Sequence, residues 1–280
     1  MFTFANEALA AEMLDPGDDR DRLGPRYCWG GYLHQLRDAD GRDLLSGPEY
    51  PGRPTAYNGQ GAPEVFCYQN YRTKEWMNVE GDIGIILGIG TIETLADGTP
   101  TLGEVCEWDR EIDGAVCTMS TEQAAHGWAY HLARRWELRG TTAISTTRIE
   151  SRGDKPLDVL WYPHPFYPLV EGGMDFHINL PIRMDDNPGF EMNGQTISMT
   201  PGFDWNTGRL QWLEGDFGGR LEAVFQHPLT GTVTMRGEFP ISHLPLWANA
   251  HTISLEPYVR YRVPPEEACQ WTVAYEFGPQ

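Results

Sequence analysis

The chain has 280 residues, a mass of 31.6 kDa and a formal net charge of −19 at pH 7. This charge repels nucleic acid and anionic membrane surfaces, so it favours a neutral or weakly charged partner. The length exceeds the usual domain size of about 150 residues, but all-β sandwiches reach it as one unit. The 31 glycines and 21 prolines are spread along the whole chain, and no linker marks a domain boundary.

The beginning of the chain and its cysteines bear on location. Residues 1–22 form an acidic leader without the basic start and long apolar run of a secretory signal. No segment approaches the roughly 20 apolar residues that a membrane-spanning helix needs. The five cysteines are scattered and include no Cys-x-x-Cys pair, which favours reduced thiols over a disulfide frame or a zinc site. The sequence therefore predicts a cytoplasmic protein without nucleic-acid or membrane partners.

Helical spacing of apolar residues is limited to the acidic leader, at about residues 6–14. Elsewhere, runs rich in aromatic and β-branched residues stand between Gly, Asp and Pro, as is typical of strands. Asp-Gly pairs at residues 40–41, 97–98 and 113–114 favour tight hairpin turns. In chain order, the predicted strands cover residues 27–36, 81–92, 104–118, 136–151, 157–162, 220–225, 232–239, 252–258 and 270–277.

The alternating run of residues 136–151 is followed by turn residues 151–154, so residues 157–162 are predicted to return beside it. No internal repeat of fixed period is present, which argues against a propeller. The sequence therefore predicts an all-β fold of two large antiparallel sheets packed face to face. We expect residues 1–280 to form a single domain of this kind.

His164 lies between Pro163 and Pro165 and among aromatic residues. Proline disfavours helix for the residue before it, so Tyr162 and His164 are both expected to be extended, which largely presets the direction of the imidazole. Histidine titrates near neutral pH, and aromatic walls suit the apolar faces of a sugar ring. A histidine satisfied by backbone groups in the core or at a sheet edge is the alternative that residue type alone leaves open.

Other chemistries lack their signatures. Gly88-Ile89-Gly90 does not continue into a dinucleotide fingerprint, and the chain has no Walker loop or Gly-x-Ser-x-Gly. His126 and His131 are five residues apart, so a metal site would have to be assembled from distant strands. We expect no cofactor. A glycosidase with two carboxylates stays open, because the chain has 40 acidic residues.

Several segments, taken in order, resemble the aldose 1-epimerases, or galactose mutarotases. Each segment is short, and the resemblance rests on their order across most of residues 26–278. It implies a large antiparallel β-sandwich of the supersandwich type. The segments are residues 27–36, 136–140 with 150–156, the His-Pro-aromatic motif 164–167, and the C-terminal pair 253–258 and 271–277.

The resemblance implies an isomerase that interconverts the anomers of a monosaccharide or its derivative, with Glu256 as general base and His164 as acid. Such a pair needs pKa values that its surroundings set apart. Three further residues are substrate-binding candidates. His126 lies in a segment similar to one in sugar-6-phosphate mutarotases, although Tyr130 stands where those proteins have arginine. Arg26 has a guanidinium fork that suits sugar hydroxyls.

Asp216 is the preferred ligand-binding aspartate in this resemblance, with Asp204 as the alternative. The chain lacks the Asn-x-x-x-Arg segment of well-characterised galactose mutarotases, so the sugar stays open, as does its phosphorylation. A non-catalytic sugar-binding module is the alternative from another class of protein, and a glycosidase or lyase could use the same fold. We expect a small-molecule sugar partner and a monomer or homodimer.

Overall fold

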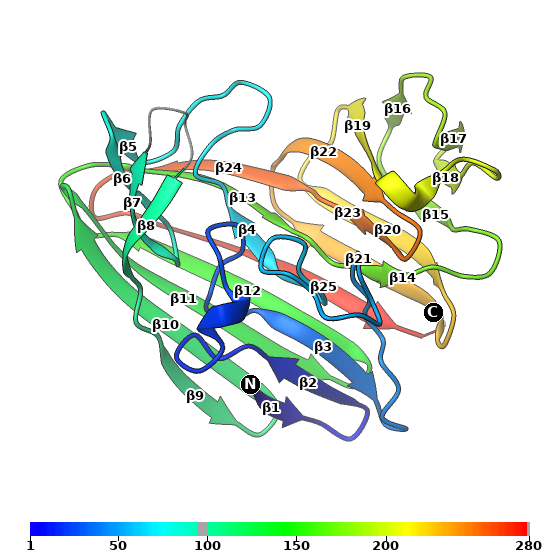
Figure 1. Ribbon diagram of the computed structural model, residues 1–280, viewed down its shortest axis with the longest axis horizontal. Helices are drawn as coiled ribbons and strands as arrows, with labels where there is room; N and C mark the ends of the chain where they lie inside the picture. Colours follow the sequence, from blue (N-terminus) through cyan, green and yellow to red (C-terminus); the bar gives the residue numbers. More distant parts are fainter. Residues whose placement is uncertain (95–99, 279–280) are drawn as a thin grey trace.

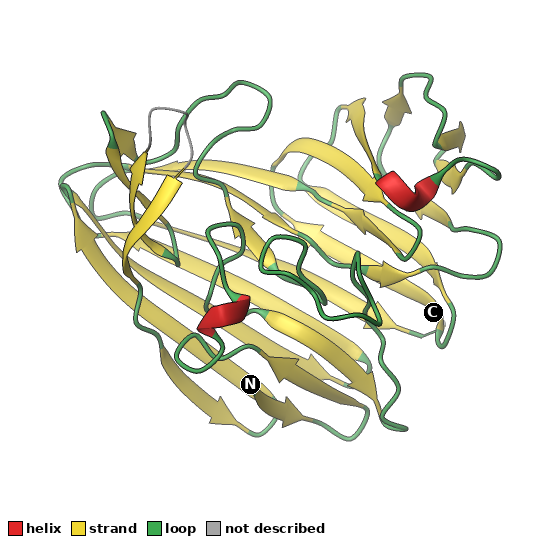
Figure 2. Cartoon of the chain, viewed as in Figure 1, coloured by secondary structure: helices red, strands yellow, loops and turns green. Residues whose placement is uncertain are grey.

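Strands make up most of the computed structural model, which describes residues 1–94 and 100–278 (Figure 2). Within these residues the helical elements are two short 3-10 turns, η1 (Arg20–Arg22) and η2 (Trp205–Thr207). None of the helices described there is long and apolar enough to cross a membrane. The all-β class predicted from the sequence is confirmed.

The larger sheet has ten strands, and its neighbouring strands run antiparallel. The long strands in its middle alternate strictly between buried and partly exposed residues, the period of a sheet with one face on the core. In spatial order its strands are β17 (Phe190–Asn193), β18 (Thr196–Met199), β15 (Asp175–Ile178), β20 (Arg220–His227), β21 (Gly231–Glu238), β25 (Ala268–Phe277), β12 (Thr142–Ser151), β11 (Trp128–Arg139), β10 (Val116–Ala125) and β9 (Asp109–Asp113).

The second sheet has eight strands and lies in front of the larger one in Figure 1. Its central strand, β22, pairs with three neighbours. Its main path is β14 (Tyr167–Pro168), β23 (Thr252–Leu255), β22 (Ile241–Ala248), β24 (Tyr258–Val263), β13 (Leu157–Pro163) and β4 (Glu64–Phe66), while β19 (Arg209–Gly215) joins β22 and β16 (Ile182–Met184) joins β19.

The two large sheets pack face to face through a continuous apolar core. Trp161 on β13 packs against Trp271 on β25, with ring centroids 5.2 Å apart. A buried ion pair also joins the layers, because Glu64 on β4 lies 2.6 Å from Arg134 on β11. Buried charges are costly unless they are paired and hydrogen-bonded, and Ser145 and Trp161 also donate to Glu64. The predicted sandwich of two sheets is therefore confirmed.

The acidic leader is not helical, contrary to the prediction for residues 6–14. It forms β1 (Phe2–Ala5) and β2 (Leu9–Met13), which pair with each other, and β2 also pairs with β3 (Leu33–Asp38). Leu9, Ala11 and Met13 are buried while the residues between them are partly exposed, which is the strand period. Their spacing of two fits a strand, and tertiary burial overrides the helix-favouring composition.

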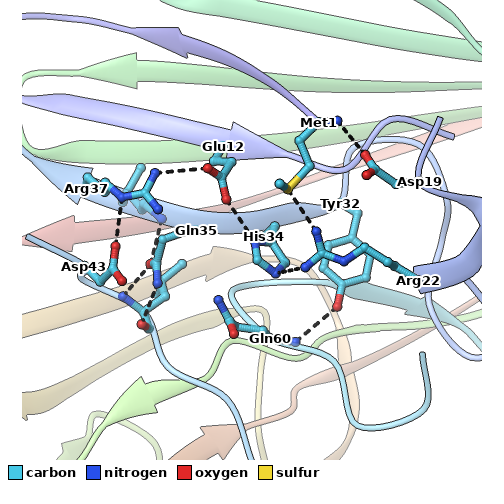
Figure 3. Close-up of polar contacts among 12 residues, drawn as sticks. Met1, Glu12, Asp19, Arg22, Tyr32, His34, Gln35, Arg37, Asp43 and Gln60 are labelled. Atoms are coloured by element: carbon cyan, nitrogen blue, oxygen red, sulfur yellow. Dashed lines mark hydrogen bonds and ion pairs between the residues drawn. The ribbon is translucent and has the colours of Figure 1, made fainter. Parts of the chain in front are cut away.

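Polar contacts link the strands of this N-terminal sheet to one another and to the segment between β2 and β3 (Figure 3). Glu12 accepts hydrogen bonds from Arg37 and His34, and the other ring nitrogen of His34 contacts Arg22 at 2.6 Å. The terminal amine of Met1 lies 2.7 Å from an oxygen of Asp19. The leader is thus an integral part of the fold.

Four further strands form a small sheet, β5 (Val79–Glu80), β6 (Ile83–Ile86), β7 (Gly90–Thr94) and β8 (Pro100–Val105), so the predicted strand 81–92 is two strands. The predicted strand 27–36 begins only at Leu33. The Asp-Gly turn at residues 113–114 joins β9 to β10 as predicted. The predicted turn at residues 97–98 lies outside the described residues.

The predicted hairpin of residues 136–151 and 157–162 is wrong. Gly140, with φ of +54°, turns the chain within the alternating run, and β11 pairs with β12 around it. β13 then leaves for the other sheet and pairs with β24 and β4. The buried positions are even-numbered up to Leu138 and odd-numbered from Ala143, so the alternation changes phase at this turn instead of continuing through it.

Candidate active site

A cavity of about 410 Å³ lies on the eight-stranded sheet. Pairing aligns Leu210 on β19 with Trp247 on β22 and Ser254 on β23. Strands point successive side chains to opposite faces, so their neighbours Leu246 and Leu255 enter the core. The cavity therefore occupies the face turned away from the sandwich core. It is lined by Arg26, Pro48, Tyr57, Asn58, Tyr71, Tyr162, His164, Phe166, Leu210, Trp212, Pro245, Trp247, Glu256 and Tyr258.

His164 is held firmly in this cavity. It follows β13 directly, and its backbone N–H donates to the carbonyl of Pro63 at 2.8 Å. Its Nδ1 lies 2.9 Å from the Ser254 hydroxyl, and the Phe166 ring stacks at an angle on the imidazole with centroids 4.4 Å apart. The flanking prolines and these contacts preset the direction of the imidazole, as the sequence predicted.

Glu256 reaches the same point from the short segment between β23 and β24. It follows β23 and precedes Pro257, which favours extended backbone, and its N–H donates to the carbonyl of Pro245 at 2.9 Å. Its Oε1 lies 3.4 Å from Nε2 of His164, and both side chains are almost completely buried. A carboxyl group and an imidazole thus face each other at one wall of the cavity.

Arg26 is the third polar group at this point. Its Nη1 donates to the Tyr57 carbonyl at 2.8 Å, and its Nη2 lies 3.3 Å from Nε2 of His164. Because a guanidinium can only donate, Nε2 accepts and the imidazole proton is on Nδ1, directed at Ser254. His164 is therefore neutral, with Nε2 unprotonated.

The electrostatics of the pair follow from its burial. Loss of solvent raises the pKa of Glu256 to about 8, although the nearby Arg26 opposes this shift. Burial also holds the pKa of His164 well below its usual range, and Arg26 lowers it further. At neutral pH the Glu256 carboxyl group is therefore protonated, and the imidazole of His164 is neutral with its own proton on Nδ1.

The structure does not bring the other two candidates to this cavity. His126 is exposed in the turn between β10 and β11, with φ of +55°, and lines a different surface hollow. Asp216 is exposed after β19, where it accepts from the N–H of Gly218. Asp204 is exposed as well and caps η2. Short motif similarity identified these residues, but such similarity carries no information on which sheet edge a turn reaches.

Several residues of the site were not predicted. Ser254 contacts His164, and Trp212 and Trp247 form walls of the cavity. Tyr162 stacks on Tyr258 with ring centroids 4.2 Å apart. The signal in the sequence was the alternation of these residues with core positions, but it is usable only once the pairing of β19, β22 and β23 is known. Among the described residues, no group of three or more His, Cys, Asp or Glu is placed to hold a metal ion.

No family model matches the sequence, and no curated protein is similar to it. Solved structures do resemble the fold. A galactose mutarotase-like protein from Lactobacillus casei ATCC 334 has a TM-score of 0.66 and 16% identity over 99% of both chains. A galactose mutarotase related enzyme from Lactobacillus acidophilus has a TM-score of 0.63 and 9% identity, covering 99% of this chain and 97% of its own.

An aldose epimerase homologue from Caenorhabditis elegans aligns over 99% of this chain and 98% of its own, with a TM-score of 0.51 and 11% identity. The likeness extends across almost the whole chain in all three comparisons. The protein has the galactose mutarotase-like fold. The resemblance stated from the ordered sequence segments is thereby confirmed at the level of the fold.

Proposed function

We propose that the protein is a cofactor-free aldose 1-epimerase-like isomerase that interconverts the anomers of a monosaccharide or its derivative. The observation that carries this proposal is the buried pair of His164 and Glu256, 3.4 Å apart at the wall of an aromatic cavity. Burying two titratable groups costs free energy, and this pair is not needed as an ion pair that holds the fold together. A role in proton transfer explains best why both groups are buried.

The chemistry needs one proton to leave the anomeric hydroxyl and one to reach the ring oxygen. Before a sugar binds, the Glu256 carboxyl group holds the proton that is to be transferred. Sugar hydroxyls that donate to this carboxyl group favour its ionised form, so the proton passes from Oε1 of Glu256 to Nε2 of His164.

Glu256 then takes the proton of the anomeric hydroxyl while His164 protonates the ring oxygen, and the bond between the anomeric carbon and that oxygen breaks. Rotation about the bond between the first two carbons turns the aldehyde over. Reversal of both proton transfers closes the ring as the other anomer and restores both residues. Ser254, 2.9 Å from Nδ1, orients His164 throughout, and Arg26, 3.3 Å from Nε2, does so while that nitrogen is unprotonated.

A non-catalytic sugar-binding module is the second candidate. One observation favours it, because neither His126 nor Asp216 lines the cavity, so two of the predicted sugar contacts are missing. A glycosidase is less well supported. It needs two carboxyl groups across the bond, and Glu256 is the one carboxyl residue among the described residues that line this cavity.

A screen of free aldoses tests the proposal. Saturation-transfer NMR at equilibrium measures exchange between α and β anomers directly, for each sugar, with and without protein. The proposal predicts exchange well above the spontaneous rate for at least one sugar. If every sugar that binds exchanges only at the spontaneous rate, the isomerase proposal is wrong and the protein is a non-catalytic sugar-binding module.

We also propose that the protein works in the cytoplasm, as a monomer or homodimer, in carbohydrate metabolism. All five cysteines are free thiols, and four of them are buried, which suits a reducing compartment. Light scattering on the purified protein measures the oligomeric state.

A further inference from the structure

The mouth of the cavity is unusually apolar for an exposed surface. Among the described residues, seven large hydrophobic side chains are exposed, and three of them lie at this mouth. Tyr57 is 70% exposed, Leu210 is 46% exposed and Tyr71 is 43% exposed. Such gathering of apolar side chains in solvent marks a binding surface more often than chance placement.

The three residues come from separate segments, so their gathering is a product of the fold. Tyr57 lies in the loop between β3 and β4, Tyr71 in the loop between β4 and β5, and Leu210 on β19. The guanidinium of Arg26 stacks on the Tyr57 ring at 4.6 Å and its Nη1 binds the Tyr57 carbonyl, which holds the ring in its exposed position. The Tyr57 side of the mouth is therefore held in place by specific contacts.

The cavity is larger than one sugar ring. A hexopyranose fills roughly 200 Å³ at the packing density of molecular crystals, which is about half of the 410 Å³ available. The acid and base pair fixes where the anomeric carbon must lie, at the wall formed by His164 and Glu256. The remaining space extends toward the apolar mouth.

The charges at the site argue for a neutral occupant of that space. Arg26 is the one cationic residue among the described residues that line the cavity, and its two terminal nitrogens already contact Tyr57 and His164. The C–H groups on the face of a second sugar ring carry slight positive charge and suit the negative face of an aromatic ring.

We propose that the mouth formed by Tyr57, Tyr71 and Leu210 is a second sugar subsite, and that the preferred substrate is a disaccharide with a free reducing end. This inference rests on the proposed function. The reaction needs a free anomeric hydroxyl at His164 and Glu256, so the second ring is attached through another oxygen of the first and lies over the apolar mouth.

Exchange kinetics on matched sugars test this inference. Glucose and galactose are compared with maltose, cellobiose and lactose, whose reducing ends are free. We expect kcat/KM for at least one disaccharide to exceed that of its own reducing-end monosaccharide by at least about tenfold, mostly through KM, because stacking remote from the reacting atoms binds substrate and transition state alike.

Leu210→Ser is the key variant. Leu210 lies at the mouth, and the hydrogen bonds that hold Arg26 and His164 do not involve it. It should lower the disaccharide-to-monosaccharide ratio of kcat/KM at least about fivefold, and Tyr71→Ala should act in the same direction. Leu229→Ser is the matched control, since Leu229 is also exposed, at 41%, but lies in the turn between β20 and β21. It should leave the ratio unchanged.

The outcomes separate the two proposals. The second subsite is wrong if kcat/KM is no higher for any disaccharide than for its monosaccharide. It is also wrong if Leu210→Ser does not change the disaccharide-to-monosaccharide ratio of kcat/KM. Neither result contradicts the proposed epimerase activity. If no sugar exchanges, the proposed function fails, and calorimetry then decides on the subsite. Tighter binding of a disaccharide that Leu210→Ser weakens supports the subsite, and equal affinity for both sugar sizes overturns it.

Discussion

His164 and Glu256 illustrate how burial alone can store a proton where chemistry needs one. Neither group is charged at neutral pH, because loss of solvent outweighs the attraction that a charged pair would gain. In the proposed anomer exchange both groups can therefore serve in either direction, because the reaction begins and ends with the same protonation. Ser254 and Arg26 contact the two imidazole nitrogens, so the proposed reaction needs little reorganisation of His164.

Replacing His164 with asparagine should lower anomer exchange by at least about a hundredfold, the usual contribution of a positioned acid. Asparagine keeps a polar group near Ser254, so we expect far-UV circular dichroism like that of the wild type. His126→Ala is the matched control, because His126 is exposed in a turn away from the cavity, and it should exchange sugar at the wild-type rate. Wild-type exchange in His164→Asn would exclude His164 from the chemistry.

Glu256 should make the stability of the protein depend on pH in a defined direction. Its folded pKa of about 8 lies above the ordinary value of 4.5. Its contribution to the free energy of unfolding is therefore complete below about pH 4.5, where the group is protonated in both states. The contribution falls as the pH rises and is lost once the pH has passed 8. Glutamine does not titrate. From pH 5 to pH 9, the unfolding free energy of wild type should therefore fall relative to Glu256→Gln by on the order of 4 kcal/mol.

Urea unfolding of both proteins across this pH range measures the difference, and the titration of every other group common to both cancels. A difference that stays constant between pH 5 and pH 9 would show that Glu256 titrates normally and is not desolvated.

At the scale of elements, pairing register decides which residues meet. β19 and β22 each contribute alternate residues to the cavity and to the core, and Ser254 on β23 contacts His164. A shift of one residue in the pairing of these strands would exchange the two sets. Individual strands such as β20, β21 and β25 were predictable, because alternation and turn residues are local. The crossing of β13 to the other sheet was not, because nothing local to residues 151–157 specifies the partner sheet.

The ion pair between Glu64 and Arg134 should be a strong link between the two layers. Replacing Glu64 with glutamine leaves the Arg134 guanidinium buried without a counter-charge, so we expect a loss of about 3–5 kcal/mol in the free energy of unfolding. Glu137→Gln is a suitable control, because its partners Arg135 and Arg139 are solvent-exposed. Its loss should stay below about 1 kcal/mol in the same denaturation experiment. Equal losses for the two variants would contradict the assigned role of Glu64.

At the scale of the whole molecule, the apolar core extends from Phe4 to Phe277, and we propose that residues 1–280 form one domain. The fold class and the pair of His164 and Glu256 could be predicted from the sequence. The Pro-His-Pro segment and the ordered motifs are local, so they can be recognised without knowing which strands pair. The rest of the cavity was not. Tyr57, Tyr71 and Leu210 come from three separate segments, and only the assembled sheets bring them to one mouth.

Anomer exchange should survive exhaustive chelation. The described residues hold no group of three or more His, Cys, Asp or Glu placed for a metal, and the proposed proton transfers use side chains alone. Exchange rates before and after dialysis against a chelator, together with elemental analysis, measure this. Stoichiometric metal that is lost together with activity would overturn the prediction.

The central claim is that Glu256 moves a proton in the reaction, and Glu256→Gln tests it most directly. Glutamine keeps the size and most hydrogen bonds of the side chain but cannot accept the proton of the anomeric hydroxyl. Equilibrium binding and NMR exchange are measured on wild type and variant with the best sugar from the screen. The account predicts sugar binding within about threefold of wild type and exchange reduced at least about a hundredfold. Exchange retained in Glu256→Gln, or sugar binding without any exchange in the wild type, would contradict it.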